Sequence, residues 1–455
     1  MTDTKTSTET TRPRAGGPMG AVGSTAAVKV FVMALSGILG IITSRLILQN
    51  FGTGAYVQYG LLSTFPTLLP FADLGMAAVV INAVAGSSSP RTDDRVKRTI
   101  VTAFRILIVS GGIMVVASIV ITVLGLWPAL LGKGLLPGGN IAAGLCLFVY
   151  GVVVPMTVGQ RILVGLKKTN VQVASQAVVA PTMLLVIGTF VMLNVPAGTY
   201  LAVVSYVANS LLSVICLAIG ARALSPQVGQ AIRLVPRIRS YPGVKAIHLA
   251  WPMLIQTVAM PLTLQTDRLL LSHAGTQDDL AQYNLAAQLF GLVLQTIAAS
   301  GIALWPHYAK ARSQGRIESP TKPTIWFTLG AVLVGTALAL VSPFLVHFIA
   351  GDRIQLSAWL LVWFVVFVAM QAAKYPVGMY MTDKAGLTFQ VIPILIMVPL
   401  NLGLSWFLIA PFGAAGPIMG SAISVLICQV VPDLWYVSRD LKRRAAAPAS
   451  ASDAE

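Results

Sequence analysis

Residues Thr266–Leu285 read TDRLLLSHAGTQDDLAQYNL, and the chain carries an echo of them at Thr43–Leu61, TSRLILQNFGTGAYVQYGL. The gapless matches are Thr43/Thr266, Arg45/Arg268, Leu46/Leu269, Leu48/Leu271, Gly52/Gly275 and Thr53/Thr276. After one inserted residue, Gln58-Tyr59 matches Gln282-Tyr283. Leucine identities are common in an apolar chain, whereas matched Arg, Gly, Thr and Gln-Tyr are not. The pattern predicts a duplicated unit, with a cation near the end of the first helix of each half.

The composition indicates a membrane protein. The chain has 455 residues, of which 56% are hydrophobic and 10% charged, and its mean hydropathy is +0.80. A soluble protein carries roughly a quarter of its residues as Asp, Glu, Lys or Arg. The net charge of +16 would suit nucleic acid if the cations clustered in a soluble domain, but they are scattered between apolar runs. We therefore expect no nucleic-acid partner.

About twelve apolar runs are each long enough for a membrane-spanning helix, which needs roughly 20 residues. The first six predicted spans are 26–49, 56–86, 99–126, 141–163, 171–194 and 199–221. The second six are 247–272, 280–308, 324–350, 357–381, 386–410 and 414–437. The sequence therefore predicts an all-α polytopic membrane protein.

The lysines and arginines predict the orientation of these spans. If the N-terminus is cytoplasmic, all but four of the 31 basic residues fall on the inner side. Lys133 and Arg353 lie in outer loops, and Arg45 and Arg268 lie within spans. Such a bias follows the positive-inside rule. Both termini are therefore predicted to be cytoplasmic.

The longest inner loop divides the chain into two equal sets of spans. We expect a disordered tail at 1–23, six-helix bundles at 24–221 and 247–437, a linker at 222–246 and a tail at 438–455. Because each bundle has an even number of spans, both have the same orientation. The two bundles should therefore be related by a pseudo-two-fold axis along the membrane normal.

The sequence carries no enzyme motif. It has no phosphate-binding glycine loop of the ATPase kind, no H-E-x-x-H and no G-x-S-x-G. Its three cysteines and four histidines are scattered over different segments, without the spacing of a metal site. We therefore expect no enzymatic activity, no cofactor and no metal, and any transport must be passive, gradient-driven or powered by another protein.

Charged residues within spans are the main candidate site residues, because a charge in the membrane is costly. Arg45 and Arg268 occupy matching positions near the outer ends of the first and seventh spans. Facing each other across the axis, they would form a cationic site, and a guanidinium donates two parallel hydrogen bonds to a phosphate. At this depth, the long side chains would equally well extend to the outer interface.

Other polar residues within the predicted spans are further candidates, and most of them have more than one interpretation. Asp73, near the middle of the second span, would partner Arg45, bind a coupling cation or proton, or bond to backbone near Pro70. Asp267 is the second candidate for the coupling ion. Gln371, Lys374 and Tyr375 share one helical face of the tenth span, where Lys374 would line the cavity or extend toward the inner interface.

Several motifs resemble those of a known family, the polysaccharide (O-antigen-type) flippases of the multidrug/oligosaccharidyl-lipid/polysaccharide exporter superfamily. They are Ser44-Arg45-Leu46 with Tyr59-Gly60, Asp73-Leu74-Gly75, Asp267–Leu271 with Tyr283-Asn284, and Trp305-Pro306 with Tyr308-Ala309. The resemblance covers nearly the whole chain in topology. It implies two six-helix bundles around a cationic cavity that opens alternately to each side of a bacterial-type plasma membrane.

The resemblance also implies a substrate, a polyprenyl-pyrophosphate-linked oligosaccharide moved from the cytoplasmic to the outer leaflet. Arg45 and Arg268 are the positions implied to hold the diphosphate, and a glycan polymerase and glycosyltransferases are the implied partners. Two alternatives stay open. One is a cation-coupled multidrug antiporter of the same superfamily, which would need acidic residues in its cavity. The other is a non-transporting scaffold of a glycan assembly complex, which would need no charges within the membrane.

Overall fold

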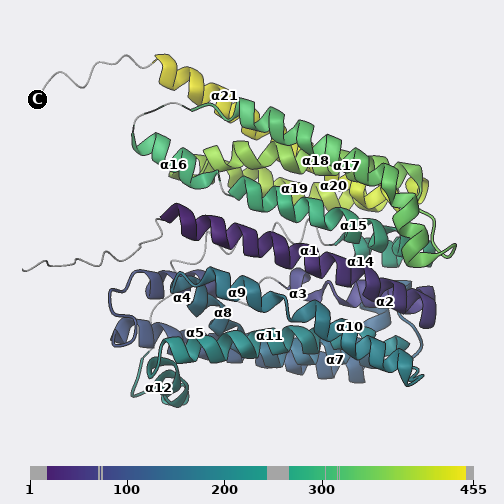
Figure 1. The fold of residues 1–455 in the computed structure, drawn as a ribbon, viewed down its shortest axis with the longest axis horizontal. Helices are drawn as coiled ribbons and strands as arrows, with labels where there is room; N and C mark the ends of the chain where they lie inside the picture. Colours follow the sequence, from purple (N-terminus) through teal and green to yellow (C-terminus); the bar gives the residue numbers. More distant parts are fainter. Residues whose placement is uncertain are drawn as a thin grey trace, which may run out of the picture.

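The computed structural model describes residues 18–69, 72, 75–242, 266–302, 304–314, 316 and 318–446. All regular secondary structure among these residues is helical (Figure 1). Asp73 and most of the predicted seventh span lie outside the described residues. Within the described part of the chain, nine helices are long and apolar enough to cross a membrane. The protein is therefore an all-α, multi-pass membrane protein, as the apolar runs predict.

The first half of the chain packs into one bundle of helices, the lower layer of Figure 1. Its elements are α1 (Pro18–Asn50), α2 (Gly52–Leu62), α3 (Phe65–Leu68), α4 (Met76–Ala85), α5 (Asp94–Val123), α6 (Trp127–Leu131), η2 (Gly132–Gly134), α7 (Gly139–Val153), η3 (Val154–Thr157), α8 (Val158–Gly165), α9 (Thr169–Gln176), α10 (Val179–Met192), η4 (Gly198–Tyr200), α11 (Leu201–Ala223) and α12 (Gln227–Leu234). Helix α1 lies along the boundary with the second bundle, between α10 and α17. Helix α12 falls inside the predicted linker 222–246.

The second half forms the upper layer of Figure 1. Its elements are α14 (Asp267–Ala274), α15 (Gln277–Ile302), α16 (Trp305–Ser313), α17 (Thr321–Ala350), α18 (Ala358–Tyr380), α19 (Lys384–Phe412), α20 (Ala415–Val425), the π-helical turn η5 (Leu426–Val430) and α21 (Val431–Ala446). Helix α15 faces α1 and α2 of the first bundle, whereas α18, α19 and α20 pack together behind it.

The predicted second span, 56–86, is not one continuous helix, and this part of the prediction is wrong. The structure divides it into α2, α3 and α4. Pro66 lies in the first turn of α3, and Gly75, just before α4, has a φ of +74°. Glycine adopts this left-handed conformation without the steric penalty that other residues incur. The predicted eighth span is likewise divided, into α15 and α16.

Small residues allow the helices to approach closely, as is typical in membranes where packing replaces the hydrophobic drive. At the contact of α5 with α7, a Cβ atom on Gly111 would lie 2.3 Å from the carbonyl oxygen of Gly151. At the contact of α8 with α11, a Cβ on Gly159 would lie 2.2 Å from the Cα of Leu217. Alanine would not fit at these glycines without movement of backbone.

Several hydrogen bonds between the two bundles lie at one end of the molecule, where α6 and η2 meet α14 and α15. The His273 Nε2 atom of α14 lies 3.1 Å from the carbonyl oxygen of Ala129, and Gln277 donates to the carbonyl of Lys133 at 3.4 Å. Gly132, with a φ of +67°, packs directly on the backbone of Ser272. The distribution of basic residues predicts that this is the outer end.

Candidate functional site

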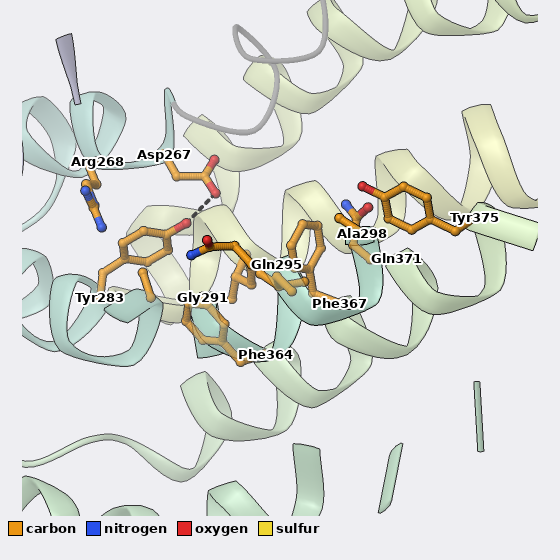
Figure 2. Close-up of a pocket in the computed structure, with 13 residues that line it drawn as sticks. Asp267, Arg268, Tyr283, Gly291, Gln295, Ala298, Phe364, Phe367, Gln371 and Tyr375 are labelled. Carbon is orange, nitrogen blue, oxygen red and sulfur yellow. Dashed lines mark hydrogen bonds between the residues drawn. The ribbon is translucent and has the colours of Figure 1, made fainter. Parts of the chain in front are cut away.

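A cavity lies where the two bundles meet, and it has two compartments. The first, about 390 Å³, is lined by α14, α15, α18 and α20 and includes Asp267, Tyr283 and Gln371 (Figure 2). The second, about 410 Å³, lies between α15 and the helices α1 and α2 of the first bundle. Arg268 and Gln295 line both compartments. We call the two together the central cavity.

Of the two predicted arginines, Arg268 lines the central cavity. It lies in the first turn of α14, is half-buried, and donates one hydrogen bond from Nη1 to the carbonyl of Gly60, 3.2 Å away in α2. Among the described residues, no carboxylate lies within ion-pair distance of its guanidinium. A guanidinium has five N–H donors. Arg268 therefore brings a positive charge with spare donors to the wall of the cavity.

Arg45 has a different environment from its repeat counterpart. Its guanidinium carbon lies 4.3 Å from the centre of the Phe348 ring of α17, and Arg45 is not a lining residue of the central cavity. The neighbouring Ser44 lines the cavity instead and donates a 2.8 Å hydrogen bond to Gln288 of α15. The structure thus does not bring the two predicted arginines together.

Asp267, the candidate for the coupling ion, is buried in a polar network beside the cavity, with 2% of its surface exposed. The Tyr283 hydroxyl donates to its carboxylate at 2.6 Å, and the Ser421 hydroxyl lies 3.2 and 3.4 Å from its two oxygens. Asn401 in turn donates to Ser421 at 2.8 Å. Figure 2 shows Asp267 and Arg268 leaving α14 in different directions. Adjacent helical residues diverge by about 100°.

The three predicted residues of α18 do not share one cavity. Gln371 and Tyr375 line the first compartment of the central cavity. Lys374 is only 9% exposed and lines an adjoining cavity of about 580 Å³, which also includes Tyr375 and Asp433. The Lys374 ammonium lies 5.6 Å from the centre of the Tyr375 ring. Tyr375 therefore borders both cavities.

Sequence reasoning missed two groups of site residues. Asp433 lies in the predicted span 414–437 but was overlooked among the acidic residues within spans, although it faces the same cavity as Lys374. Asn284, Gln288 and Gln295 line the central cavity from α15. Their spacing of four and seven residues inside an apolar run was the signal that could have identified them.

Comparisons with solved structures show which known proteins share this fold. No family model and no curated protein matches the chain. Among solved structures, the lipid II flippase MurJ in an inward closed conformation is similar, with a TM-score of 0.64, 13% identity, and coverage of 92% of this chain and 90% of that one. An inward-facing multidrug resistance MATE transporter of the MOP superfamily gives 0.60, 16% identity, and coverage of 93% and 100%.

A third similar structure is a MOP superfamily transporter from Pyrococcus furiosus, described as having a binding pocket of reversed polarity. Its TM-score is 0.63 and its identity 13%, over 95% of this chain and 98% of that one. The chain spans nearly the full length of all three proteins. At such low identities, similarity of this extent establishes the architecture. The chain therefore has the fold of the MOP superfamily transporters.

Proposed function

We propose that the protein is a flippase that moves a polyprenyl-pyrophosphate-linked oligosaccharide across a bacterial-type plasma membrane by alternating access. The observation that carries the proposal is Arg268, which lines a cavity between the two bundles and has no carboxylate of the described residues within ion-pair distance of its guanidinium. The fold is similar to that of solved transporters and flippases. Guanidinium binds phosphate oxygens in pairs, through parallel hydrogen bonds. The diphosphate would therefore bind at Arg268.

The remaining polar groups of the cavity suit a glycan. Gln295, Gln371 and Tyr375 line the same compartment as Arg268, and the Gln371 amide nitrogen has no hydrogen-bond partner among the described residues. Buried amide groups without partners are costly. We propose that sugar hydroxyls satisfy them, with Lys374 contacting the glycan from the adjoining cavity.

The contacts at the α14 end support an inward-facing arrangement. His273 and Gln277 join the second bundle to the backbone of Ala129 and Lys133 in the first. These contacts lie at the predicted outer end, beside the cavity. We propose that they separate in the outward-facing state, and that both termini are cytoplasmic.

Asp267 remains our candidate for coupling transport to an ion gradient. Its carboxylate, the hydroxyl of Ser421 and the amide oxygen of Asn401 are oxygen groups in one buried network, and the Asn401 oxygen has no partner among the described residues. A proton or a monovalent cation would suit such a site. Asp73, the other candidate, lies outside the described residues and stays a prediction.

The repeat supplies a matched pair of variants to test the proposal. We expect Arg268→Ala to weaken binding of inorganic diphosphate to the purified protein about ten- to a hundredfold, because a hydrogen bond to a charged group contributes about 1.5–3 kcal/mol. Glycan export in cells should fall in parallel. Arg45→Ala should retain most of both activities if Arg268 alone holds the diphosphate. Normal binding and export by a well-expressed double variant would exclude the phosphate site.

The multidrug antiporter remains the second candidate, because Asp267, Phe364 and Phe367 line one compartment. A carboxylate and aromatic rings would suit a cationic drug. Asp267→Asn discriminates between the two functions. A loss of drug resistance with unchanged glycan export would favour the antiporter, whereas a loss of glycan export with unchanged drug resistance would favour the flippase.

A further inference from the structure

An apolar groove of about 440 Å³ lies between α15 and α17, on the second bundle. Leu292, Val293 and Ile297 line it from α15, and Phe327, Ala331 and Val334 line it from α17. Two hydroxyl side chains, Thr296 and Ser300, also line it, and Thr296 donates its hydroxyl to the carbonyl of Leu292 at 2.9 Å, within its own helix. The groove is thus suited to a hydrocarbon chain.

The groove adjoins the central cavity through one side chain. Leu292 lines both the groove and the compartment between α15 and α1. The Leu292 side chain also packs against Gly37 of α1, so it lies at the contact between the two bundles. A Cβ atom added to Gly37 would lie 2.7 Å from it. A molecule that enters the cavity here therefore meets polar groups on one side of Leu292 and an apolar groove on the other.

This division matches an amphipathic lipid. The cavity side carries Arg268, Gln288 and Gln295, which suit a charged and hydroxylated headgroup. The groove side is apolar and half open, with Val334 51% exposed. Because bilayer lipid is itself apolar, moving a hydrocarbon chain into the groove gains little binding free energy from burial alone. The favourable contribution would come from van der Waals packing of the chain beside the bound headgroup.

We infer that the groove between α15 and α17 binds the first part of an isoprenoid chain whose diphosphate lies in the central cavity. The inference rests on the proposed function and specifies where the lipid part of its substrate binds. The chain would pass Leu292 at the seam between α1 and α15. Its far end would remain in the bilayer.

Gly330 allows the groove to be filled without disturbing the fold. It lies on the exposed side of α17 and lines the groove, and a Cβ atom added there meets no atom within 4 Å. Gly330→Leu should therefore fold normally and occupy the groove. Gly112 of α5 is also exposed and equally open around its Cβ, but lies on the other bundle. Gly112→Leu is the matched control, and Val334→Phe is a second variant that fills the groove.

The test compares two ligands, polyprenyl diphosphate and inorganic diphosphate, by thermal stabilisation of the purified full-length protein. We expect Gly330→Leu and Val334→Phe to weaken the apparent affinity for polyprenyl diphosphate by about tenfold. Affinity for inorganic diphosphate should not change, and Gly112→Leu should behave as the unmodified protein with both ligands. Unchanged polyprenyl diphosphate affinity in both groove variants would overturn the inference.

The two ligands separate failure of this inference from failure of the proposed function. If the groove variants weaken binding of polyprenyl diphosphate but inorganic diphosphate does not bind at all, the proposed phosphate site is wrong and the inference about the groove is supported. Phosphatidylglycerol, a bilayer lipid, serves as a third, control ligand. If the groove variants weaken its binding as much as they weaken that of polyprenyl diphosphate, the groove binds any lipid chain and the inference fails. It fails too if Gly330→Leu dissociates an oligomer, since the groove would then be an interface between copies.

Discussion

The Tyr283 hydroxyl donates a 2.6 Å hydrogen bond to Asp267, and this bond ties α15 to the start of α14. Tyr283 belongs to the repeated Gln-Tyr pair, whose first copy is Gln58-Tyr59. The first copy has a different partner, because the Tyr59 hydroxyl lies 3.9 Å from the Met183 sulfur atom. Among the described residues, the duplicated tyrosine thus has a carboxylate partner in the second half and a sulfur contact in the first.

This difference predicts unequal effects of the same substitution. Tyr283→Phe leaves a buried carboxylate with one donor fewer, and an unsatisfied buried polar group costs about 1–3 kcal/mol. We expect the thermal unfolding midpoint of the purified protein to fall. Tyr59→Phe, the matched control, loses a weak contact with the Met183 sulfur and an interaction with the Ser63 side chain, but leaves no buried carboxylate short of a donor. It should therefore unfold closer to the unmodified protein than Tyr283→Phe does. Equal midpoints for the two variants would contradict the assigned role of Tyr283.

His273 is predicted to help keep the outer end closed. Its Nδ1 atom lies 2.8 Å from the carbonyl oxygen of Leu269, and its Nε2 atom lies 3.1 Å from that of Ala129. The contact with Ala129 joins the two bundles, so its loss should make the cavity more accessible from the outer side.

We would measure this by labelling a cysteine placed at Gln295 with an impermeant reagent added from outside, in a chain whose native cysteines are replaced. Labelling should be faster in His273→Ala than in the same chain with His273 intact, because alanine cannot make the contact with Ala129. His347→Ala is the control at the same end. Equal labelling rates with and without His273 would rule out the role of this contact.

Neighbouring glycines of α5 predict opposite changes in stability. A Cβ on Gly111 would lie 2.3 Å from the Gly151 carbonyl oxygen, whereas a Cβ on Gly112 meets no atom within 4 Å. Gly111→Ala should destabilise the protein by about 1–3 kcal/mol through overpacking. Gly112→Ala should stabilise it by up to about 1 kcal/mol, because alanine favours the helix. Equilibrium unfolding in mixed micelles checks both signs, and a stabilised Gly111→Ala would show that α5 and α7 do not pack so closely.

The stacking of Arg45 on Phe348 predicts a measurable energetic coupling between α1 and α17. Cation–π contacts contribute about 0.5–2 kcal/mol. A double-mutant cycle with Arg45→Met and Phe348→Leu should give a coupling energy in this range. Additive effects would mean that the stacking makes no contribution. Arg268→Met combined with Phe348→Leu is the control pair and should be additive, because Arg268 contacts Gly60 instead.

Much of the fold follows from local properties of the chain. Apolar runs long enough to cross a membrane predict the helices, and nine of the twelve predicted spans correspond to described helices of suitable length and hydropathy. The exceptions are informative. In the span 56–86, hydropathy is continuous, but Pro66 and the left-handed Gly75 interrupt the helix. The predicted seventh span lies mostly outside the described residues, and the predicted eighth is divided between α15 and α16.

The candidate site depends on which side of each helix meets the other bundle. Repetition in the sequence identified Arg45 and Arg268 as equivalent, and it also aligned Ser44 with Asp267. Tertiary packing gives these matched residues different surroundings. Ser44, and not Arg45, lines the cavity from α1, whereas both Asp267 and Arg268 line it from α14. The cavity that Lys374 shares with Asp433 likewise forms only where α18 packs beside α21.

The sequence by itself determined the helical membrane class, the duplication and the predicted orientation, because these depend on composition, periodicity and the placement of charge along the chain. The tertiary structure decided which charged side chains line the cavity and which pack against aromatic rings. A helix points successive side chains about 100° apart. A small rotation of a helix about its axis can therefore move a side chain from the wall of the cavity to a packed contact with another helix. Contacts between residues distant in sequence set that rotation.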